Sequence, residues 1–523
     1  MPLEQVLIAG EWCPENADHA FSATNPSTRE ALDKRYPISS GATLERALSA
    51  ATAAAAELTR MPPEPIAHFL ELCADGLEAR AEVLVQAAHT ETGLPREPRL
   101  RNVELPRTAG QLRQAARAVR TRSWCQPVLD RKLEIRSMFV PLGAPVFVLG
   151  PNNFPFAFNA VMGGDFAAAI AAQNPVIAKA HPSHPETSRL LAETALEALT
   201  ASELPTSSLQ LIYDLEPGLG CSLVADARIG ATAFTGSRRS GLALKSAADR
   251  AGRPIYLELG SINPVFVLAG ALRERGREIA EELFASCALA AGQFCTNPGL
   301  SVVLNTPEGT QFLEYVHSLF LAEPSGCLFS ASSATHLSET VATLVGAGAR
   351  VVCGGRPRSD MGFGFDNTLL TTSGQNFLEH ASALQTEAFG AVHLMVVVKD
   401  VDEMERVARA LEGNLTGALY SSRQGSDDIA YEQVAAALAP RVGRLLNDKM
   451  PTGVAISPAM HHGGPYPSTG HPGFTSVGLP ASIQRFAARR CYDAVRQHRL
   501  PPELRNDNPT GCWRSVDGVW TNS

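Results

Sequence analysis

The sequence lacks any long apolar segment. No run of apolar residues approaches the roughly 18 that a membrane-spanning helix needs, so we expect no membrane partner. Its first residues show no basic stretch followed by an apolar one, and we therefore expect no secretory signal peptide and a cytoplasmic protein. An excess of basic residues is missing too. The 45 lysines and arginines are outnumbered by 53 aspartates and glutamates, a net charge of -8, which disfavours a nucleic-acid partner.

The ten cysteines form no CxxC pair and show none of the Cys/His spacings of a zinc site. We therefore predict reduced thiols, no disulfide framework and no metal site. His461 and His462 are adjacent on a loop rich in glycine and proline, where neighbouring imidazoles cannot easily share an ion. We predict that this pair has a role in loop structure.

The chain does contain enough apolar residues for several cores. With 523 residues, 45% hydrophobic and 19% charged, it is typical of a globular protein of two or three domains. Amphipathic helices are predicted at 43–60 and 66–92. Residues 122–142 alternate like a β-hairpin, and its edge could pair with another subunit.

A βαβ pattern starts at residue 146. Apolar strands alternate with helical stretches and predict a doubly wound parallel sheet over about 145–256; the strands are 146–149, 175–179, 209–213 and 231–235, with an alanine-rich helix that extends to Gln173. A second α/β region is predicted from Asn263 to about residue 445, followed by a tail that wraps the surface or a neighbour. Ligands of such sheets bind at the carboxyl ends of the strands.

Cys295 lies between Gly292 and Gly299, where a predicted helix is followed by a strand. A glycine-rich turn lets a substrate approach the backbone, and a thiol near backbone N–H donors or a base becomes a nucleophile. Cys295 is therefore a candidate nucleophile. The alternative is an inert thiol in the core.

Two polar residues at predicted strand ends could support such chemistry. Glu258 interrupts an apolar strand, and burial would raise its pKa into the range of a general base; the alternative is an exposed glutamate at a strand end. Asn153 stands between two prolines and could donate its amide to an oxyanion, with a plain Asn-Asn turn as the alternative.

Two further motifs could hold a cofactor. Gly236, Ser237 and Gly241 follow a predicted strand and open a helix, where backbone N–H groups could bind phosphate; an ordinary turn has the same spacing. Glu387 and Phe389 could place a carboxylate on a ribose and a ring beside a flat cofactor, or they mark the edge of a helix or turn.

Taken together and in order, these motifs resemble the aldehyde dehydrogenase superfamily over nearly the whole chain. The residues that carry the resemblance are Asn153-Phe154-Pro155, Lys179, Phe234-Thr235-Gly236-Ser237, Glu258-Leu259-Gly260, Cys295 and Glu387-Ala388-Phe389-Gly390. Segments 179–185, 258–264, 292–299 and 462–467 look like the branch that contains α-ketoglutaric semialdehyde dehydrogenases and NADP-dependent aldehyde dehydrogenases.

The resemblance implies an α/β fold with two doubly wound parallel-sheet domains and an oligomerisation β-hairpin. A cofactor-binding domain is expected at 1–121 and 143–257, and a catalytic domain at 258–455. The hairpin and a C-terminal extension would occupy 122–142 and 456–523, and a homodimer or homotetramer is expected.

The resemblance also implies a role for each matching residue. Cys295 would attack an aldehyde, Asn153 and the Cys295 backbone N–H would hold the oxyanion, and Glu258 would activate the water that hydrolyses the thioester. The residues expected to bind the cofactor are Lys179 at the adenosine ribose, Gly236, Ser237 and Gly241 at the pyrophosphate, and Glu387 with Phe389 at the nicotinamide ribose and ring.

Pro182 bears on the choice between NAD and NADP. NAD-preferring members often have a glutamate at this position that would repel a 2′-phosphate, so NADP is the expected cofactor, with NAD also used. Asp214 and Glu216 could oppose a 2′-phosphate. Arg238 and Arg239 could neutralise it or could form a solvated surface pair.

The branch resemblance favours 2,5-dioxopentanoate, oxidised to 2-oxoglutarate, as the substrate. Fatty or other aliphatic aldehydes are the alternative. An acid substrate needs a cation, for which Arg441, Arg485 and Arg505 are the candidates. An apolar funnel would suit either substrate, and its candidate rings are Phe154, Phe156, Phe158 and Phe294.

A cysteine-dependent ester hydrolase is the rival from another class, because it shares the thiol, the oxyanion hole and the base. Such an enzyme normally needs a positioned histidine. The only histidines expected near these motifs are His181 and His184, on the cofactor side, and this disfavours the hydrolase.

Overall fold

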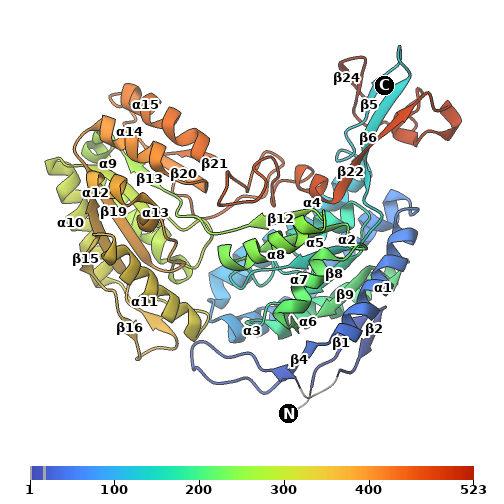
Figure 1. Cartoon of the computed structure of the whole chain (residues 1–523), viewed down its shortest axis with the longest axis horizontal. Helices are drawn as coiled ribbons and strands as arrows, with labels where there is room; N and C mark the ends of the chain where they lie inside the picture. Colours follow the sequence, from blue (N-terminus) through green and yellow to red (C-terminus); the bar gives the residue numbers. More distant parts are fainter. Residues whose placement is uncertain (1–2, 16–18) are drawn as a thin grey trace.

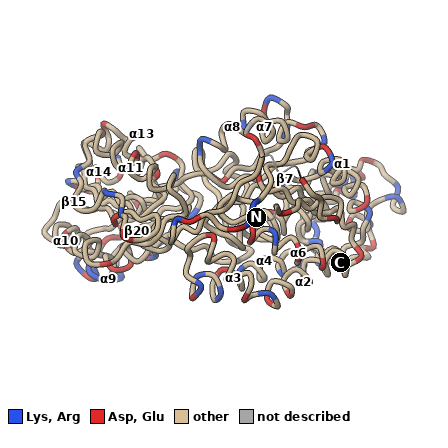
Figure 2. The backbone as a smooth tube through the Cα atoms, turned by 90° about the horizontal axis from the view of Figure 1, so that it is seen from below, with Lys and Arg blue, Asp and Glu red and all other residues tan. Residues whose placement is uncertain are grey.

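The computed structural model describes residues 3–15 and 19–523. It has two α/β lobes, each built around a seven-stranded sheet, and a separate five-stranded sheet that projects from the N-terminal lobe (Figure 1). These features confirm the predicted fold class. Acidic and basic residues are interspersed along both lobes (Figure 2).

The N-terminal sheet has the strand order β12-β11-β7-β8-β9-β1-β2. Its parallel strands are β7 (Val146–Leu149), β8 (Val176–Lys179), β9 (Leu209–Ile212), β11 (Ala231–Thr235) and β12 (Ile255–Glu258). They are nearly continuous apolar runs because helices cover both faces of a parallel sheet. The helices between them are α5 (Gly164–Ala171), α6 (Pro185–Ala201), α7 (Pro217–Ala225) and α8 (Arg238–Arg250).

The strand order of this sheet reverses at β7. The chain passes from β7 to β8 and β9 on one side, then crosses back to β11 and β12 on the other. The carboxyl ends of strands at such a reversal leave a crevice where ligands bind. The edge strands β1 (Val6–Ile8) and β2 (Glu11–Cys13) are antiparallel and lay outside the sequence prediction.

The helices of the first 121 residues differ from the prediction in one respect. The expected helices are α1 (Gly41–Leu58), α2 (Pro63–Ala79) and α3 (Ala81–Thr92), followed by α4 (Leu105–Thr121). The single helix predicted at 66–92 is thus interrupted at Arg80, whose φ of -98° and ψ of 14° are not helical. Arg80 pairs with Glu197 of α6 at 2.6 Å, which ties the break to the neighbouring helix.

The C-terminal lobe contains the second sheet, with the order β15-β18-β19-β14-β13-β20-β21. Its strands are β13 (Val265–Val267), β14 (Leu300–Leu304), β15 (Arg350–Cys353), β18 (Thr368–Ser373), β19 (Val392–Val398), β20 (Asn414–Tyr420) and β21 (Val442–Asn447). Only β15 is antiparallel to its neighbour among these strands. Helix α9 (Ala269–Ala288) precedes β14, and the Cys295 loop connects the two.

The predicted hairpin is β5 (Val128–Asp130) and β6 (Ile135–Pro141). The C-terminal tail adds β22 (Ala487–Asp493), β23 (Arg514–Val516) and β24 (Val519–Thr521), giving the order β22-β6-β5-β23-β24. The tail therefore completes the hairpin sheet (Figure 1). In the described ranges, no helix combines the length and apolar composition that a membrane crossing requires.

A long loop between β21 and β22 runs from the C-terminal lobe to the hairpin sheet and crosses the N-terminal sheet on its way (Figure 1). Leu259 N–H donates to the carbonyl of Ser468 at 2.8 Å, and Glu258 forms an isolated antiparallel bridge with Thr469. We call residues 448–480 the crossing loop. Its contacts with the end of β12 bring residues of the distant tail to the predicted site.

Candidate active site

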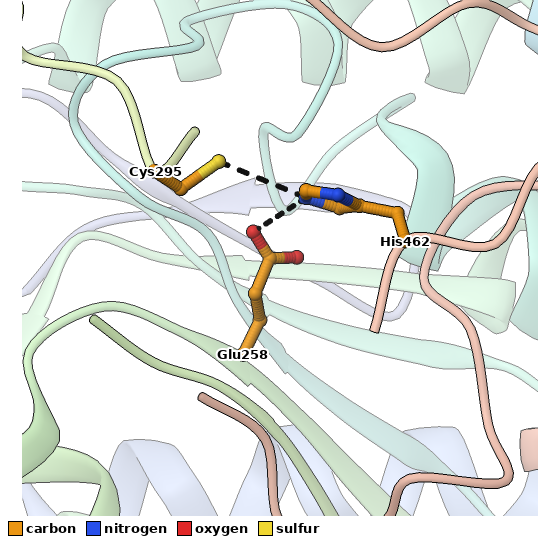
Figure 3. Close-up of side chains that lie close together, drawn as sticks. All are labelled: Glu258, Cys295 and His462. Carbon is orange, nitrogen blue, oxygen red and sulfur yellow. Dashed lines mark hydrogen bonds and ion pairs between the residues drawn. The ribbon is translucent and has the colours of Figure 1, made fainter. Parts of the chain in front are cut away.

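Three side chains from distant segments meet between the lobes. The Sγ of Cys295 lies 3.7 Å from Nε2 of His462, and the same nitrogen lies 2.8 Å from Oε1 of Glu258 (Figure 3). Cys295 follows α9, Glu258 ends β12, and His462 belongs to the crossing loop. A thiol, an imidazole and a carboxylate in contact form the set of groups needed for nucleophilic catalysis.

The Cys295 loop has an unusual backbone. Ala290, Ala291 and Gly292 all have positive φ, at 49°, 55° and 74°. Two alanines in the left-handed region store strain, which surrounding contacts must hold in place. A Cβ at Gly292 would lie 2.2 Å from the carbonyl carbon of Gly390, so glycine is required there.

Asn263 fixes the far side of this loop. Its Nδ2 donates to the carbonyls of Cys295 at 2.8 Å and Asn297 at 2.9 Å. Asn263 is fully buried and itself has a positive φ of 46°. The sequence analysis did not identify this role, although Asn263 belongs to the segment 258–264.

The oxyanion donors lie beside the thiol. Asn153 is buried, and its Nδ2 donates one hydrogen to the carbonyl of Gln293 at 3.0 Å. An amide nitrogen carries two hydrogens, so a second remains for a substrate oxygen. The backbone N–H of Cys295 donates to no described residue. The two donors that the oxyanion would need are therefore both at hand.

Glu258 is buried, with 5% of its surface exposed, so the alternative of an exposed strand-end glutamate is wrong. The expectation of a raised pKa is also wrong. Burial raises the pKa of the Glu258 carboxyl, but the charge of His462 and hydrogen bonds from His462 and Ser476, the latter at 2.8 Å, together lower it below its ordinary value. Glu258 is accordingly a carboxylate at neutral pH, able to accept a proton.

Burial, reinforced by the charge of Glu258, raises the pKa of the Cys295 thiol well above its ordinary value. The resting nucleophile is therefore a thiol, and a base must remove its proton. His462 Nε2, which donates to Glu258, connects the thiol to that carboxylate, and the two groups together offer such a base. The expectation that only His181 and His184 lie near the motifs is wrong, because the buried His462 contacts the thiol. The predicted role of the histidine pair in loop structure did not include this contact.

The same three side chains could also bind a metal ion. One ligand atom from each lies within 4.8 Å of the others, and this is the one such group found in the described part of the chain. Cysteine, histidine and glutamate are all zinc ligands. Only the spatial contact between distant segments reveals the group, since the sequence spacing contains no metal motif.

A cavity of about 440 Å³ opens beside the thiol. Its walls include most of the residues predicted for catalysis and cofactor binding, namely Asn153, Lys179, Pro182, Gly236, Ser237, Glu258, Cys295, Glu387 and Phe389. It lies at the carboxyl ends of β7, β8, β11 and β12, where the strand reversal places a ligand. Gly241 is the predicted cofactor residue that does not line it.

The phosphate-binding motif is the start of α8. The Ser237 side chain caps this helix and accepts a hydrogen bond from Ser240 N at 3.3 Å. The helix N-terminus, with its free N–H groups, is suited to a pyrophosphate. Gly241 serves packing, because a Cβ there would lie 2.4 Å from the Leu259 side chain.

The ribose positions carry two acidic groups. Lys179 Nζ, at the end of β8, pairs at 2.8 Å with Asp214, which follows the neighbouring strand β9. Glu387 accepts from Ser261 N at 3.2 Å, and burial raises the pKa of its carboxyl to about 7. A Cβ at Gly260 would lie 2.1 Å from the Glu387 carboxylate, so this glycine makes room for it.

Arg238 and Arg239 are the two arginines that could neutralise a 2′-phosphate. No contact of either residue directs its side chain towards such a group. Arg238 pairs with Glu412 at 3.0 Å, and its guanidinium lies 5.7 Å from the ring centre of Tyr466. Arg239 is exposed. The Arg238 side chain is thus directed to the C-terminal lobe and the crossing loop.

An apolar cluster lies on the other side of the thiol. It contains Phe154, Ala157, Phe158, Phe294 and Val477, with Val454 and Met460 packed against it. The Phe154 ring makes edge contacts with Phe158 at 5.2 Å and Phe294 at 5.3 Å between ring centres. The fourth predicted ring, Phe156, is instead fully buried in the core of the N-terminal lobe.

None of the three arginines expected to bind a substrate acid is part of this cluster. Arg485 is buried and pairs with Asp165 at 2.7 Å. Arg505 donates to the Leu500 carbonyl at 3.0 Å in the tail, and Arg441 is exposed beside β21. The cations near the cluster are others, Arg99 and Arg107.

Comparisons with known proteins agree with this geometry. The model of the aldehyde dehydrogenase family matches residues 12–464. The chain is 35% identical to α-ketoglutaric semialdehyde dehydrogenase 2 of Azospirillum brasilense, with 99% of both chains covered. It is 33% identical to the α-ketoglutaric semialdehyde dehydrogenase of Acinetobacter baylyi over 87% of each chain. Among solved structures, lactaldehyde dehydrogenase from Escherichia coli aligns with a TM-score of 0.80 at 20% identity, covering 94% of this chain and 99% of that one.

Proposed function

Because the chain belongs to the aldehyde dehydrogenase family, we propose that it oxidises 2,5-dioxopentanoate to 2-oxoglutarate. The general reaction is an NAD(P)-dependent oxidation of an aldehyde. The observation that carries the proposal is the contact of Cys295, His462 and Glu258 at one wall of the cofactor-sized cavity. Two relatives that are similar over most of their length and named for this semialdehyde support the choice of substrate.

In the first step the Cys295 sulfur attacks the aldehyde carbon. The thiol proton passes to Nε2 of His462, 3.7 Å away, as the proton that this nitrogen donates to Glu258 moves onto the carboxylate. At the same time the carbon–sulfur bond forms and the carbonyl electron pair moves onto oxygen. The oxyanion accepts hydrogen bonds from Asn153 Nδ2 and the Cys295 N–H. His462 therefore stays neutral, and Glu258, 2.8 Å away, holds the proton until solvent removes it.

A bound nicotinamide dinucleotide supplies the hydride acceptor that converts the thiohemiacetal to a thioester. We assign Lys179 to its adenosine ribose, Gly236 and Ser237 to its pyrophosphate, and Glu387 with Phe389 to its nicotinamide half. Gly241 lets α8 approach the sheet at the same place. All but Gly241 line the single cavity that contains the thiol, so the residues present fit the group.

Glu258 completes the cycle. Its lowered pKa keeps the carboxyl ionised, so it can take a proton from the water that attacks the thioester carbon. The carbon–sulfur bond then breaks, the acid leaves, and the proton taken from water returns from Glu258 through His462 to the sulfur. One carboxylate thus accepts the thiol proton in the first step and activates water in the second.

We propose that NAD is preferred to NADP, although Pro182 permits both. Asp214 carries a negative charge beside Lys179, the residue assigned to the adenosine ribose, and the two are already paired. Two negative groups sharing one lysine repel each other, whereas a 2′-hydroxyl could donate to Asp214. Because of this ion pair we expect NAD to be preferred, whereas the sequence alone favoured NADP.

Ester hydrolysis is a second activity that the geometry favours. The histidine whose absence counted against a hydrolase is in contact with the thiol. An activated ester could acylate Cys295 without any cofactor, and Glu258 would assist its hydrolysis. Release of p-nitrophenol from p-nitrophenyl acetate, with and without NAD, measures this activity.

We propose a homodimer or homotetramer that works in the cytoplasm. The hairpin sheet carries large apolar side chains that are 60–66% exposed, namely Leu133, Trp513, Val519 and Trp520. A partner subunit would cover them. All ten cysteines are free thiols, which suits a reducing compartment.

The deciding experiment is absorbance at 340 nm with 2,5-dioxopentanoate, succinate semialdehyde and hexanal, each with NAD and NADP. We expect reduced cofactor with the wild-type protein and none with Cys295→Ala. The highest kcat/KM is expected for 2,5-dioxopentanoate with NAD. Absence of signal with every pair, with p-nitrophenyl acetate still hydrolysed, would favour the hydrolase instead.

A further inference from the structure

Two arginines contact the same phenyl ring but differ in their partners. Arg99 lies 4.6 Å from the ring centre of Phe154, pairs with the buried Glu104 and donates to the Asn153 carbonyl at 3.1 Å. Arg107 lies 5.4 Å from the same ring and 5.1 Å from that of Phe158. Its Nε and Nη2 atoms are buried, and no group of the described chain accepts a hydrogen bond from them.

A buried guanidinium with unused donors is costly. Arginine stays charged in proteins, and a buried charge is destabilising unless an anion or hydrogen-bond acceptors compensate it. Burial lowers the pKa of Arg107, the positive charge of Arg99 lowers it further, and the negative charges of Glu104 and Glu258 oppose that effect. The site therefore favours an additional anion in contact with Arg107.

The carboxylate near Arg107 is already used. Glu104 is fully buried, pairs with Arg99, and accepts from the backbone N–H groups of Phe156 at 2.8 Å and Ala157 at 3.0 Å. Another nearby cation, Arg444, donates to the Pro451 carbonyl at 2.8 Å and the Gly453 carbonyl at 3.2 Å. Of these cations, Arg107 has the most donors left for a ligand, because Arg99 leaves only its Nε without an acceptor.

The position of Arg107 relates it to the substrate. Phe154 and Phe158 line the cavity that contains Cys295, and the Arg107 guanidinium contacts both rings. Arg107 belongs to α4, outside the set of cofactor-side residues that line this cavity. An aldehyde bound at Cys295 could therefore direct its other end past the two rings to the guanidinium.

We propose that Arg107 binds the carboxylate of the substrate and selects aldehydes that carry an acid at their far end. The planar guanidinium can pair with both oxygens of a carboxylate, which gives direction as well as attraction. The inference rests on the proposed dehydrogenase function and deepens it by naming the residue that determines substrate class.

The test compares Arg107→Met with Arg107→Lys. Methionine keeps the apolar contact with the rings but removes the charge, and lysine keeps the charge without the fork. We expect kcat/KM for 2,5-dioxopentanoate and succinate semialdehyde to fall by about 10- to 100-fold in Arg107→Met, mainly through KM, with that for hexanal nearly unchanged. The kcat/KM of Arg107→Lys for the acid substrates should lie between that of the wild type and that of Arg107→Met.

Arg113→Met is the matched control. Arg113 is on the same helix, and it pairs with Asp75 at 2.7 Å and Glu78 at 2.6 Å on the outside of the lobe. The substitution Arg113→Met removes the same charge. It should leave the ratio of kcat/KM for the acid substrates to kcat/KM for hexanal unchanged. Glutarate provides a second measurement: it should inhibit hexanal oxidation competitively in the wild type and in Arg113→Met, but not in Arg107→Met.

The outcomes separate the two proposals. An equal loss for acid and neutral aldehydes in Arg107→Met, or inhibition by glutarate that survives the substitution, would overturn the role of Arg107 while leaving the dehydrogenase intact. If no aldehyde is oxidised by the wild type, the proposed function fails. A rise in melting temperature on addition of glutarate, present in the wild type and lost in Arg107→Met, would still support the carboxylate site in that case.

Discussion

On the cofactor side of Cys295, the cavity wall is formed by residues at or just after the carboxyl ends of strands, whereas the opposite side is formed by a helix, a phenyl cluster and the crossing loop. Lys179 ends β8 and Gly236 directly follows β11. Arg107 and His462 come from α4 and from residues beyond β21. The first side follows from sheet topology, and the second depends on contacts between remote segments.

This difference explains how one fold could serve many aldehydes. The dinucleotide site proposed at the strand reversal at β7 lies next to the thiol whatever the substrate is. Residues of α4 and the crossing loop can change without disturbing the sheet, because loops tolerate variation better than buried strands do. Substitutions on the two sides should therefore have different kinetic signatures, and the predictions below test that separation.

The largest effect is expected at Glu258, which contacts both sides. Glu258→Gln keeps the side-chain shape but cannot accept a proton from water, so steady-state turnover should fall by about 10²- to 10⁴-fold. The first turnover of hydride transfer should survive, because an imidazole that is no longer bonded to a carboxylate can itself accept the thiol proton at Nε2. Stopped-flow absorbance at 340 nm should thus show a burst followed by very slow turnover. Loss of the burst would mean that Glu258 is needed already for thiol activation.

The next effect concerns His462. In His462→Gln the thiol loses the imidazole that connects it to Glu258, and the burst should slow by about 10²-fold near neutral pH. Because burial raises the pKa of Cys295, the thiolate fraction increases with pH, so the variant should regain rate steeply as pH rises. Its neighbour provides the control: His461→Gln should behave like the wild type. A burst rate equal to that of the wild type would show that His462 is dispensable.

The sequence identified the strand-end residues because each one stands beside a recognisable strand and turn. Cys295, Glu258 and Asn153 were expected together, and the structure brings all three to one cavity. His462 could not be found this way. Its contact with Glu258 joins residues 204 positions apart, through a loop without periodic pattern.

Arg485 illustrates the opposite error. It seemed available for a substrate acid, but its partner Asp165 lies 320 positions away and is invisible to local patterns. The availability of Arg107 likewise depends on Glu104 being used by Arg99 and by two backbone N–H groups. Motifs indicate which groups a chain has, and only the packing indicates which of them still lack a partner.

A smaller effect is expected on the cofactor side. Asp214→Asn removes the negative charge that competes for Lys179, and kcat/KM with NADP should rise about tenfold, while that with NAD should change little. Glu216→Gln, two residues further and exposed, is the control and should change the ratio much less. Steady-state kinetics with both cofactors provide the measurement. An unchanged NADP/NAD ratio in Asp214→Asn would remove Asp214 from the account of cofactor choice.

The smallest effect is a pH dependence of stability at Glu387. Burial raises the pKa of its carboxyl to about 7 from an ordinary 4.5, so the folded protein binds this proton more tightly than the unfolded chain. The resulting stabilisation is complete below pH 4.5 and is lost as pH rises towards 7. Glu387→Gln stays neutral throughout, so its melting temperature relative to the wild type should rise between pH 5 and pH 8, by about 1–2 °C for a chain of this size.

Bound NAD should reduce that difference. Ribose hydroxyls that donate to Glu387 favour its ionised form, so they would lower the pKa and stabilise the wild type at pH 8 more than the variant. Melting temperatures at pH 5 and pH 8, each with and without NAD, measure this coupling. If NAD raises the melting temperature of the variant at pH 8 as much as that of the wild type, Glu387 does not contact the cofactor. The cofactor-binding residues would then be limited to Lys179 and the start of α8.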